Sequence, residues 1–131
     1  MSAITTHVLD TARGTPAVGV PVRLERVDAG GCAEIARSST DASGRVSELG
    51  PALIEPGTYR LVFDTAAYAR ARLSRGGGAA GTEASPQTAA ARAPATFFPE
   101  VTVTFTVADD GGHYHVPLLL SPFGYSTYRG T

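Results

Sequence analysis

Three histidines are the side chains in this sequence best suited to acid–base or metal chemistry: His7, His113 and His115. Imidazole titrates near neutral pH, and three neutral imidazoles are a common zinc site. His113 and His115 are two residues apart in a segment that alternates like a strand, so they project from one face. Spacing alone leaves three interpretations open: ordinary surface histidines, a three-histidine zinc site, and metal-free general acid/base catalysis.

Arg45 and the last residues of the chain are the other candidates for chemistry. Arg45 follows Gly44 and opens the segment GRVSEL. Its guanidinium either forms an ion pair at the rim or presents a fork of donors to a planar, oxygen-rich ligand. The chain ends in SPFGYSTYRGT, which contains three aromatic residues. Chain ends ordinarily fray and are often polar. We therefore expect this tail to dock, for example against another subunit, and to bring Tyr128, the Thr131 hydroxyl and the α-carboxylate together.

Strands must position these groups, and alternation of apolar and polar residues predicts them. The clearest alternating segments are VGVPVRLERV (18–27), TYRLVFD (58–64), VTVTFTV (101–107) and HYHVPLLL (113–120). Proline inside the first and last of these segments favours a sheet edge or a bulge there. In the last segment the more apolar face lies opposite the two histidines. We therefore expect His113 and His115 to face away from the core, toward a pocket or another subunit.

Turn sequences separate these segments and indicate the fold class. ARGTPA, DASG, EPGT and ADDGG lie between them, and glycine in such turns accepts a positive φ at no steric cost. About seven or eight strands at regular intervals predict an all-β protein, an antiparallel β-sandwich. Alanine and arginine favour one short helix at about residues 66–73.

Residues 74–96 differ from the rest of the chain in composition. This stretch is rich in glycine and alanine and lacks large apolar side chains. Such a segment buries too little surface to offset its ordering entropy. We predict a single domain over residues 1–131, in which about 74–96 is a flexible surface insertion.

Length and composition limit the possible functions. The 131 residues suffice for one domain, and the net charge of −1 gives no electrostatic footprint for nucleic acid or a membrane surface. No apolar run approaches the roughly 20 residues of a membrane span, and no signal peptide is visible. A single cysteine, Cys32, excludes an intrachain disulfide and suits a reducing compartment. We therefore expect a cytoplasmic location. Cys32 has no basic partner beside it in the sequence, so we expect no nucleophilic role for its thiol.

Three motifs together resemble the transthyretin-like family, and specifically its 5-hydroxyisourate hydrolase branch. They are THVLDTARGTPAVGVPVRLER near the start, TDASGRV in the middle and HYHVPLLLSPFGYSTYRGT at the end. The final tetrapeptide, Tyr-Arg-Gly-Thr, resembles the Tyr-Arg-Gly-Ser/Thr ending that separates the enzyme branch from transthyretin. The resemblance covers nearly the whole chain outside residues 74–96, where this chain carries an insertion of about fifteen to twenty residues.

The resemblance implies a fold, an assembly and an activity. The implied fold is an eight-stranded transthyretin-like (prealbumin-like) sandwich with one short helix. The implied assembly is a homotetramer, a dimer of dimers, with active sites between dimers. The implied activity is hydrolysis of 5-hydroxyisourate in urate catabolism without a metal or other cofactor. The implied catalytic residues are His7, Arg45 and His115, and the implied substrate-binding residues are His7, Arg45, Tyr128 and Thr131.

Two other functions remain as alternatives to the hydrolase. A non-enzymatic transthyretin-like protein would carry a small aromatic ligand in the same channel but would lack the catalytic set. A zinc hydrolase would use the three histidines as ligands. The sequence does not decide which histidine is the general base.

Overall fold

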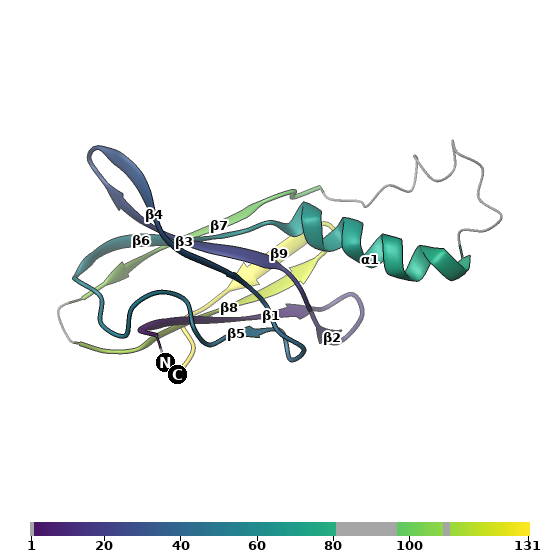
Figure 1. The fold of residues 1–131 in the computed structure, drawn as a ribbon, viewed down its shortest axis with the longest axis horizontal. Coiled ribbons are helices and arrows are strands. Elements are labelled where there is room, and N and C mark those ends of the chain that lie inside the picture. The colour runs from purple at the N-terminus through teal and green to yellow at the C-terminus, as the bar shows by residue number, and fades with distance from the viewer. Residues whose placement is uncertain (1, 81–96, 109–110) are drawn as a thin grey trace.

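Two β-sheets packed face to face form the body of the protein (Figure 1). The computed structural model describes residues 2–80, 97–108 and 111–131. The first sheet has the order β2-β1-β8-β9, with β5 also paired to β1, and its strands are β1 (Ile4–Asp10), β2 (Thr15–Pro16), β5 (Arg45–Val46), β8 (Tyr114–Ser121) and β9 (Gly124–Thr127). The second sheet has the order β4-β3-β6-β7, and its strands are β3 (Pro21–Asp28), β4 (Gly31–Ser39), β6 (Gly57–Phe63) and β7 (Val101–Val107).

The expected all-β sandwich is confirmed, with one difference in strand direction. β1 and β8 run parallel, whereas every other strand pair described is antiparallel. The described residues form nine strand segments, of which β2 and β5 are only two residues long. β1 is central to its sheet because β8 lies on one side and both short strands lie on the other.

The core lies between the sheets and follows the alternation seen in the sequence. β1 contributes Ile4 and Val8, and the four other long alternating strands, β3, β6, β7 and β8, contribute Val22, Leu24, Tyr59, Leu61, Phe63, Val101, Val107, Tyr114, Val116, Leu118 and Leu120. His115 is only half-buried and belongs to the opposite face of β8. The prediction that the histidines face away from the core is therefore confirmed.

The prediction of a sheet edge is wrong for both prolines. Pro21 begins β3, which lies between β4 and β6, and Pro117 lies inside β8, which lies between β1 and β9. The bulge in β3 lies farther along the strand, between Leu24 and Glu25. Proline has no N–H to donate to the strand ladder. The regular pairing of β9 ends at Thr127, whose hydroxyl donates to the Pro117 carbonyl at 2.7 Å. The interior proline is thus tolerated where its neighbouring strand ends.

Helix α1 (Thr65–Ala80) is longer than the predicted short helix. Asp64 caps its start by accepting a hydrogen bond from the Ala67 N–H at 2.9 Å. The helix continues to Ala80, so the prediction of a flexible loop from residue 74 is wrong for 74–80. Once a helix is nucleated, each further residue adds a hydrogen bond, and alanine favours this extension. The remainder of the predicted insertion, 81–96, lies outside the described residues.

A buried carboxylate ties α1 to the first sheet. Asp10, at the end of β1, is 4% exposed. The Tyr68 hydroxyl donates to Asp10 Oδ2 at 2.7 Å, and Arg72 lies 3.5 Å from the same oxygen. Burial, together with the bond to Asp10, raises the pKa of Tyr68 to about 12.

In Figure 1, α1 extends away from the two chain ends. No helix in the described ranges is long and apolar enough to cross a membrane.

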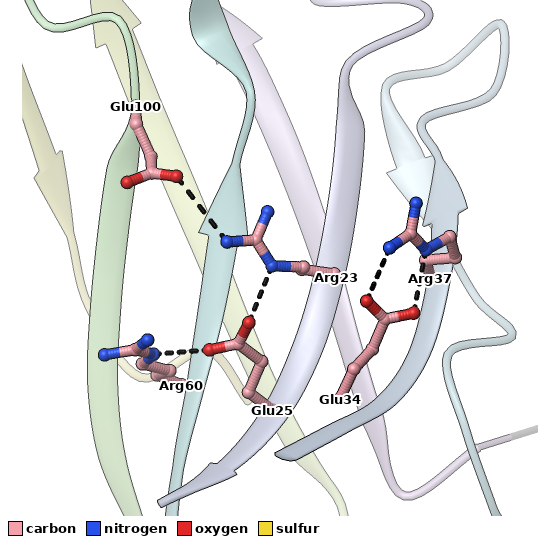
Figure 2. A network of polar contacts seen from close by, with 6 residues as sticks. All are labelled: Arg23, Glu25, Glu34, Arg37, Arg60 and Glu100. Carbon is pink, nitrogen blue, oxygen red and sulfur yellow. Dashed lines mark hydrogen bonds and ion pairs between the residues drawn. The ribbon is translucent and has the colours of Figure 1, made fainter. Parts of the chain in front are cut away.

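The outer face of the second sheet carries a network of ion pairs (Figure 2). Glu25 is the centre of this network because its two oxygens accept hydrogen bonds from Arg23 and Arg60, each at 2.6 Å. Glu100 lies 3.6 Å from Arg23. The hydrogen bonds from Arg23 and Arg60 lower the pKa of Glu25. The Glu25 side chain is only 10% exposed, whereas Arg23 and Arg60 are 36% and 33% exposed, so the carboxylate is the shielded partner of these pairs.

We expect Glu25→Gln to lower the free energy of unfolding at pH 7 by about 1–3 kcal/mol, because two charge-assisted hydrogen bonds are lost. The pKa of Glu25 is lower in the folded state, so its stabilising contribution is present above the unfolded pKa of about 4.3 and is lost as the pH falls through the folded pKa. Urea titrations at pH 7 and pH 3 measure this.

Glu34→Gln is the matched control, because Glu34 pairs with Arg37 on the same sheet but is 37% exposed. Exposed ion pairs contribute little to stability. An equal loss in both variants would contradict the special importance of Glu25.

Candidate functional site

The outer face of the first sheet collects the histidines and Arg45, since strand register sets which side chains are neighbours. Thr5 pairs with His115 across β1 and β8. His7 pairs with Pro117 on the β8 side of β1 and with Arg45 on the β5 side. Paired residues project from the same face, and residues two apart on one strand do as well. His7 and His115 are therefore diagonal neighbours, with Cα atoms roughly 8 Å apart from strand spacing and rise.

The loop before β5 is built around Asp41. Its Oδ1 accepts hydrogen bonds from the Ser43 N–H, the Ser43 hydroxyl and the Arg45 N–H, at 2.8–3.0 Å. These bonds lower the pKa of Asp41, with the Arg45 N–H contributing most. Gly44 adopts φ +79°, and a Cβ there would lie 2.6 Å from the Val8 carbonyl oxygen. Only glycine therefore fits the turn that brings Arg45 against β1.

The same loop orients the ring of His7. His7 Nε2 donates to the Ser43 carbonyl at 2.9 Å, since a carbonyl oxygen only accepts. In the neutral ring this bond places the proton on Nε2 and leaves the lone pair on Nδ1. The Ser43 carbonyl therefore makes Nδ1 the atom of His7 that can accept a proton.

Thr5 joins the other two histidines. Its hydroxyl oxygen lies 3.0 Å from His113 Nε2 and 2.8 Å from His115 Nδ1. Thr5 is buried, whereas His113 is exposed and His115 is half-buried. The sequence analysis missed Thr5, although it lies two residues before His7 in a strand and so shares its face. With Nδ1 of His115 held by Thr5, Nε2 is the ring nitrogen left for a bound molecule.

The surroundings of His115 disfavour a charged ring. Burial lowers its pKa first, and the positive charge of Arg45 and the neighbouring His113 and His7 lower it further. Each of these effects penalises the imidazolium more than the neutral imidazole. His115 is therefore held neutral and able to accept a proton at neutral pH.

The C-terminal tail packs against His115 from the side away from β1. Gly130 N–H donates to the His115 carbonyl at 2.8 Å, in the same register as β9 and β8. A Cβ on Gly130 would lie 2.6 Å from His115 Cδ2, so the ring lies directly on the glycine. The shared register puts Tyr128 opposite Pro117, on the face that carries His7. Arg129 points to the other face, with its guanidinium carbon 4.5 Å from the centre of the Tyr114 ring.

The structure brings together most of the residues singled out in the sequence. His7, Arg45, His115 and Tyr128 share one face, and the tail docks against its own chain. Tyr128 remains 58% exposed. Thr131 is exposed and makes no hydrogen bond within the described part of the chain, so its binding role stays a prediction. Cys32 is exposed on β4, in the other sheet.

The zinc alternative gains no support from this geometry. Within residues 2–80, 97–108 and 111–131, no group of three His, Cys, Asp or Glu side chains is arranged to hold a metal ion. Two of the three imidazoles instead converge on the Thr5 hydroxyl. The donor set is that of a hydrogen-bonded histidine pair.

We expect Arg45→Gln to raise the pKa of His115, because the positive charge of Arg45 lowers it in the native protein. In the native protein the ring titrates below the ordinary value of about 6.5. NMR titration of the histidine Cε1–H resonances measures the midpoint. Arg37→Gln, an exposed arginine of the other sheet, is the control. A midpoint unmoved by Arg45→Gln would contradict the electrostatic coupling.

Comparison with known proteins identifies the relatives of this chain. Residues 4–130 match the model of the HIUase/Transthyretin family. The chain is 42% identical over 134 residues to the 5-hydroxyisourate hydrolase of Mus musculus, covering 99% of this chain and 96% of that protein. It is 41% identical over 130 residues to the 5-hydroxyisourate hydrolase of Deinococcus radiodurans, with 98% and 95% covered.

Solved structures agree with the sequence comparison. The 5-hydroxyisourate hydrolase of Klebsiella pneumoniae superimposes with a TM-score of 0.70 at 33% identity, covering 100% of this chain and 94% of that one. Transthyretin from Sparus aurata has a TM-score of 0.70 at 29% identity, with 99% and 97% covered. The motifs at both ends, the sandwich and these matches lead to one conclusion: the chain belongs to the HIUase/Transthyretin family.

Proposed function

We propose that the outer face of the first sheet is the active site at which this chain hydrolyses 5-hydroxyisourate. Relatives named 5-hydroxyisourate hydrolase, at about 40% identity over nearly the full chain, and the matching structure of such a hydrolase support this activity. The chain is a hydrolase of urate catabolism. The single observation that supports this location is the side-by-side register of Arg45, His7, Thr5 and His115 across three strands.

The reaction sets three chemical requirements. Water opens the six-membered ring of 5-hydroxyisourate at an amide bond and gives 2-oxo-4-hydroxy-4-carboxy-5-ureidoimidazoline. The attacking water must lose a proton, the tetrahedral oxyanion must be stabilised, and the leaving nitrogen must gain a proton. Two imidazoles and a guanidinium on one face provide groups for all three.

The histidines act as acid and base in this proposal. His7 offers the Nδ1 lone pair, because Ser43 holds its Nε2 proton. His115 offers Nε2, because Nδ1 faces Thr5. The low pKa of His115 keeps the ring neutral and able to take a proton from water at neutral pH.

Arg45 and the tail bind the substrate in this proposal. Arg45 is exposed and free of ion pairs within the described residues, so its fork of donors is available to urate-like oxygens and to the oxyanion. Tyr128, opposite Pro117, closes the face from the tail side, and Thr131 contributes its hydroxyl at the chain end. No metal or other cofactor is required for this mechanism.

Assembly into a homotetramer, a dimer of dimers, is part of the same proposal. Two features of the single chain support it. First, β7 and β9 are both edge strands of their sheets and can pair with another copy. Second, the site face carries an exposed Tyr128 and a half-buried Leu119 beside the polar groups. A facing copy would cover this face and exclude water from the site.

A cytoplasmic location is also part of the proposal, because the exposed thiol of Cys32 suits a reducing compartment.

The alternative is a non-enzymatic protein that carries a small ligand in the same channel. A sea bream transthyretin in complex with thyroxine superimposes with a TM-score of 0.70 at 30% identity, so the sandwich alone does not separate the two functions. The higher identity to hydrolases and the set of His7, Arg45 and His115 favour the enzyme. An assay that follows the decay of freshly generated 5-hydroxyisourate separates them directly.

We expect His7→Asn and His115→Asn each to lower kcat by about 10²–10⁴-fold, the contribution typical of general acid–base catalysis. Arg45→Gln should lower kcat/KM by a comparable factor, because it removes both a binding and an oxyanion-stabilising group. Spectroscopic decay of 5-hydroxyisourate measures the rates. Arg37→Gln is the control, and sedimentation velocity checks that the assembly is intact. Full activity in both histidine variants would refute the assignment.

We expect Gly130→Ala to reduce activity by about 10-fold or more, because its Cβ would displace the His115 ring, and displacements of about 1 Å have large effects on rate. Gly124→Ala in β9 is the matched control, since its Cβ would lie 3.6 Å from the nearest atom. Neither glycine has a positive φ, so backbone strain is equal. Equal activity of the two variants would contradict the prediction that the packing of Gly130 against the His115 ring matters for catalysis.

A further inference from the structure

Thr5 holds one hydroxyl proton between two imidazole nitrogens. Its oxygen lies 3.0 Å from His113 Nε2 and 2.8 Å from His115 Nδ1. A hydroxyl donates one hydrogen bond and accepts others. When both rings are neutral and Thr5 donates to one of them, the other ring can donate to Thr5. A continuous chain of two hydrogen bonds then links His113 to His115.

We propose that Thr5 and His113 form a proton relay behind His115, so that the proton which His115 takes from water is held on His113 during the reaction. This inference rests on the proposed function and extends it to two residues that act through His115. It also assigns the general base: His115 accepts the proton at Nε2. Thr5 and His113 are therefore positioning residues that act through His115.

The protons balance in this relay. At the start, His115 carries its proton on Nδ1 and donates to Thr5, which donates to His113 Nε2. As His115 Nε2 takes a proton from water, Nδ1 passes its proton to Thr5, and Thr5 passes its own to His113. His115 stays neutral and His113 becomes the imidazolium. The reverse transfer delivers the proton from His115 Nε2 to the leaving nitrogen and restores the starting state.

The location of the charge is the physical reason for a relay. A positive charge on His115 is disfavoured by burial and by Arg45 on β5 and His7 on β1, which face it on the same sheet surface. The same charge on His113 is exposed to water, which stabilises it. Arg129, the charged residue of the tail, lies over the Tyr114 ring on the other face. The relay thus moves charge from a half-buried ring to a solvated one.

Burial makes Thr5 unsuitable for direct contact with substrate. It is 7% exposed, and its hydroxyl is already shared by the two rings. Thr6, its neighbour, donates to the Val116 carbonyl on the core face and plays no part in the relay. A change at Thr5 should therefore act on kcat through His115 and leave substrate binding unchanged.

The kinetic test is a double-mutant cycle on 5-hydroxyisourate decay. We expect Thr5→Val and His113→Asn each to lower kcat by about 10²-fold, the lower end of the contribution of general acid–base catalysis, with KM unchanged. Thr5→Ser, which keeps the hydroxyl, should restore most of the activity. The double variant should be no slower than either single variant, because both changes interrupt one chain. Additive losses in the double variant, or full activity in Thr5→Val, would overturn the relay.

The second test uses the free protein and needs no turnover. Nitrogen-15 NMR of labelled histidine above pH 8 should find the proton of His115 on Nδ1 in the native protein and in Thr5→Ser. In Thr5→Val the preference should be lost. A native His115 with its proton on Nε2 would overturn the relay even in an active enzyme. Absence of any 5-hydroxyisourate decay would instead refute the proposed function, and the NMR result would still decide the hydrogen-bonded chain. If Thr5→Val fails to fold, the loss of kcat in His113→Asn and the position of the His115 proton in the native protein still decide the relay: full activity in His113→Asn, or a native proton on Nε2, would overturn it.

Discussion

The seven paired positions between the parallel strands β1 and β8 determine which side chains meet on the outer face of the first sheet. A shift of one residue would turn Thr5 and His7 into the core and bring Thr6 and Val8 to the surface. The core prevents this shift, because Ile4, Val8 and the apolar side of β8 are buried between the sheets. Burial of hydrocarbon on one face thus fixes the position of imidazoles on the other. The site is a consequence of sheet register as much as of its own hydrogen bonds.

The two sheets use polar groups in different ways. On the second sheet, Glu25 lies between two arginines and its charge is satisfied within the chain. On the first sheet, Arg45 lies near Asp41 but forms no direct ion pair among the described residues, and His115 is held neutral. Charges that are paired stabilise the fold, whereas the guanidinium of Arg45, beside the neutral ring of His115, is available to a ligand. This contrast separates the structural face from the chemical one.

Alternation in the sequence was sufficient to predict the core side of β3, β6, β7 and β8 and the outward direction of His113 and His115, and together with the turn sequences it predicted the sandwich. The grouping of His7 with Arg45 was predicted only from the resemblance to a family. The parallel direction of β1 and β8 could not be predicted, because alternation has the same period in parallel and antiparallel strands. The role of Thr5 was missed for a related reason: its contacts come from residues more than a hundred positions away. The helix was underestimated because residues 74–96 lack large apolar side chains, and the whole stretch was therefore interpreted as a loop that buries too little surface to be ordered.

The central claim is that His7, Arg45 and His115 act together on one bound molecule. A crystal structure of the protein with a non-hydrolysable analogue of 5-hydroxyisourate tests this most directly. The account predicts the analogue on the outer face of β1 and β8, with its oxygens on the Arg45 guanidinium and the amide carbon next to a water held by His115 Nε2. It also predicts a second copy of the chain covering the site. An analogue bound elsewhere, or bound on this face without contact to Arg45 and either histidine, would contradict it.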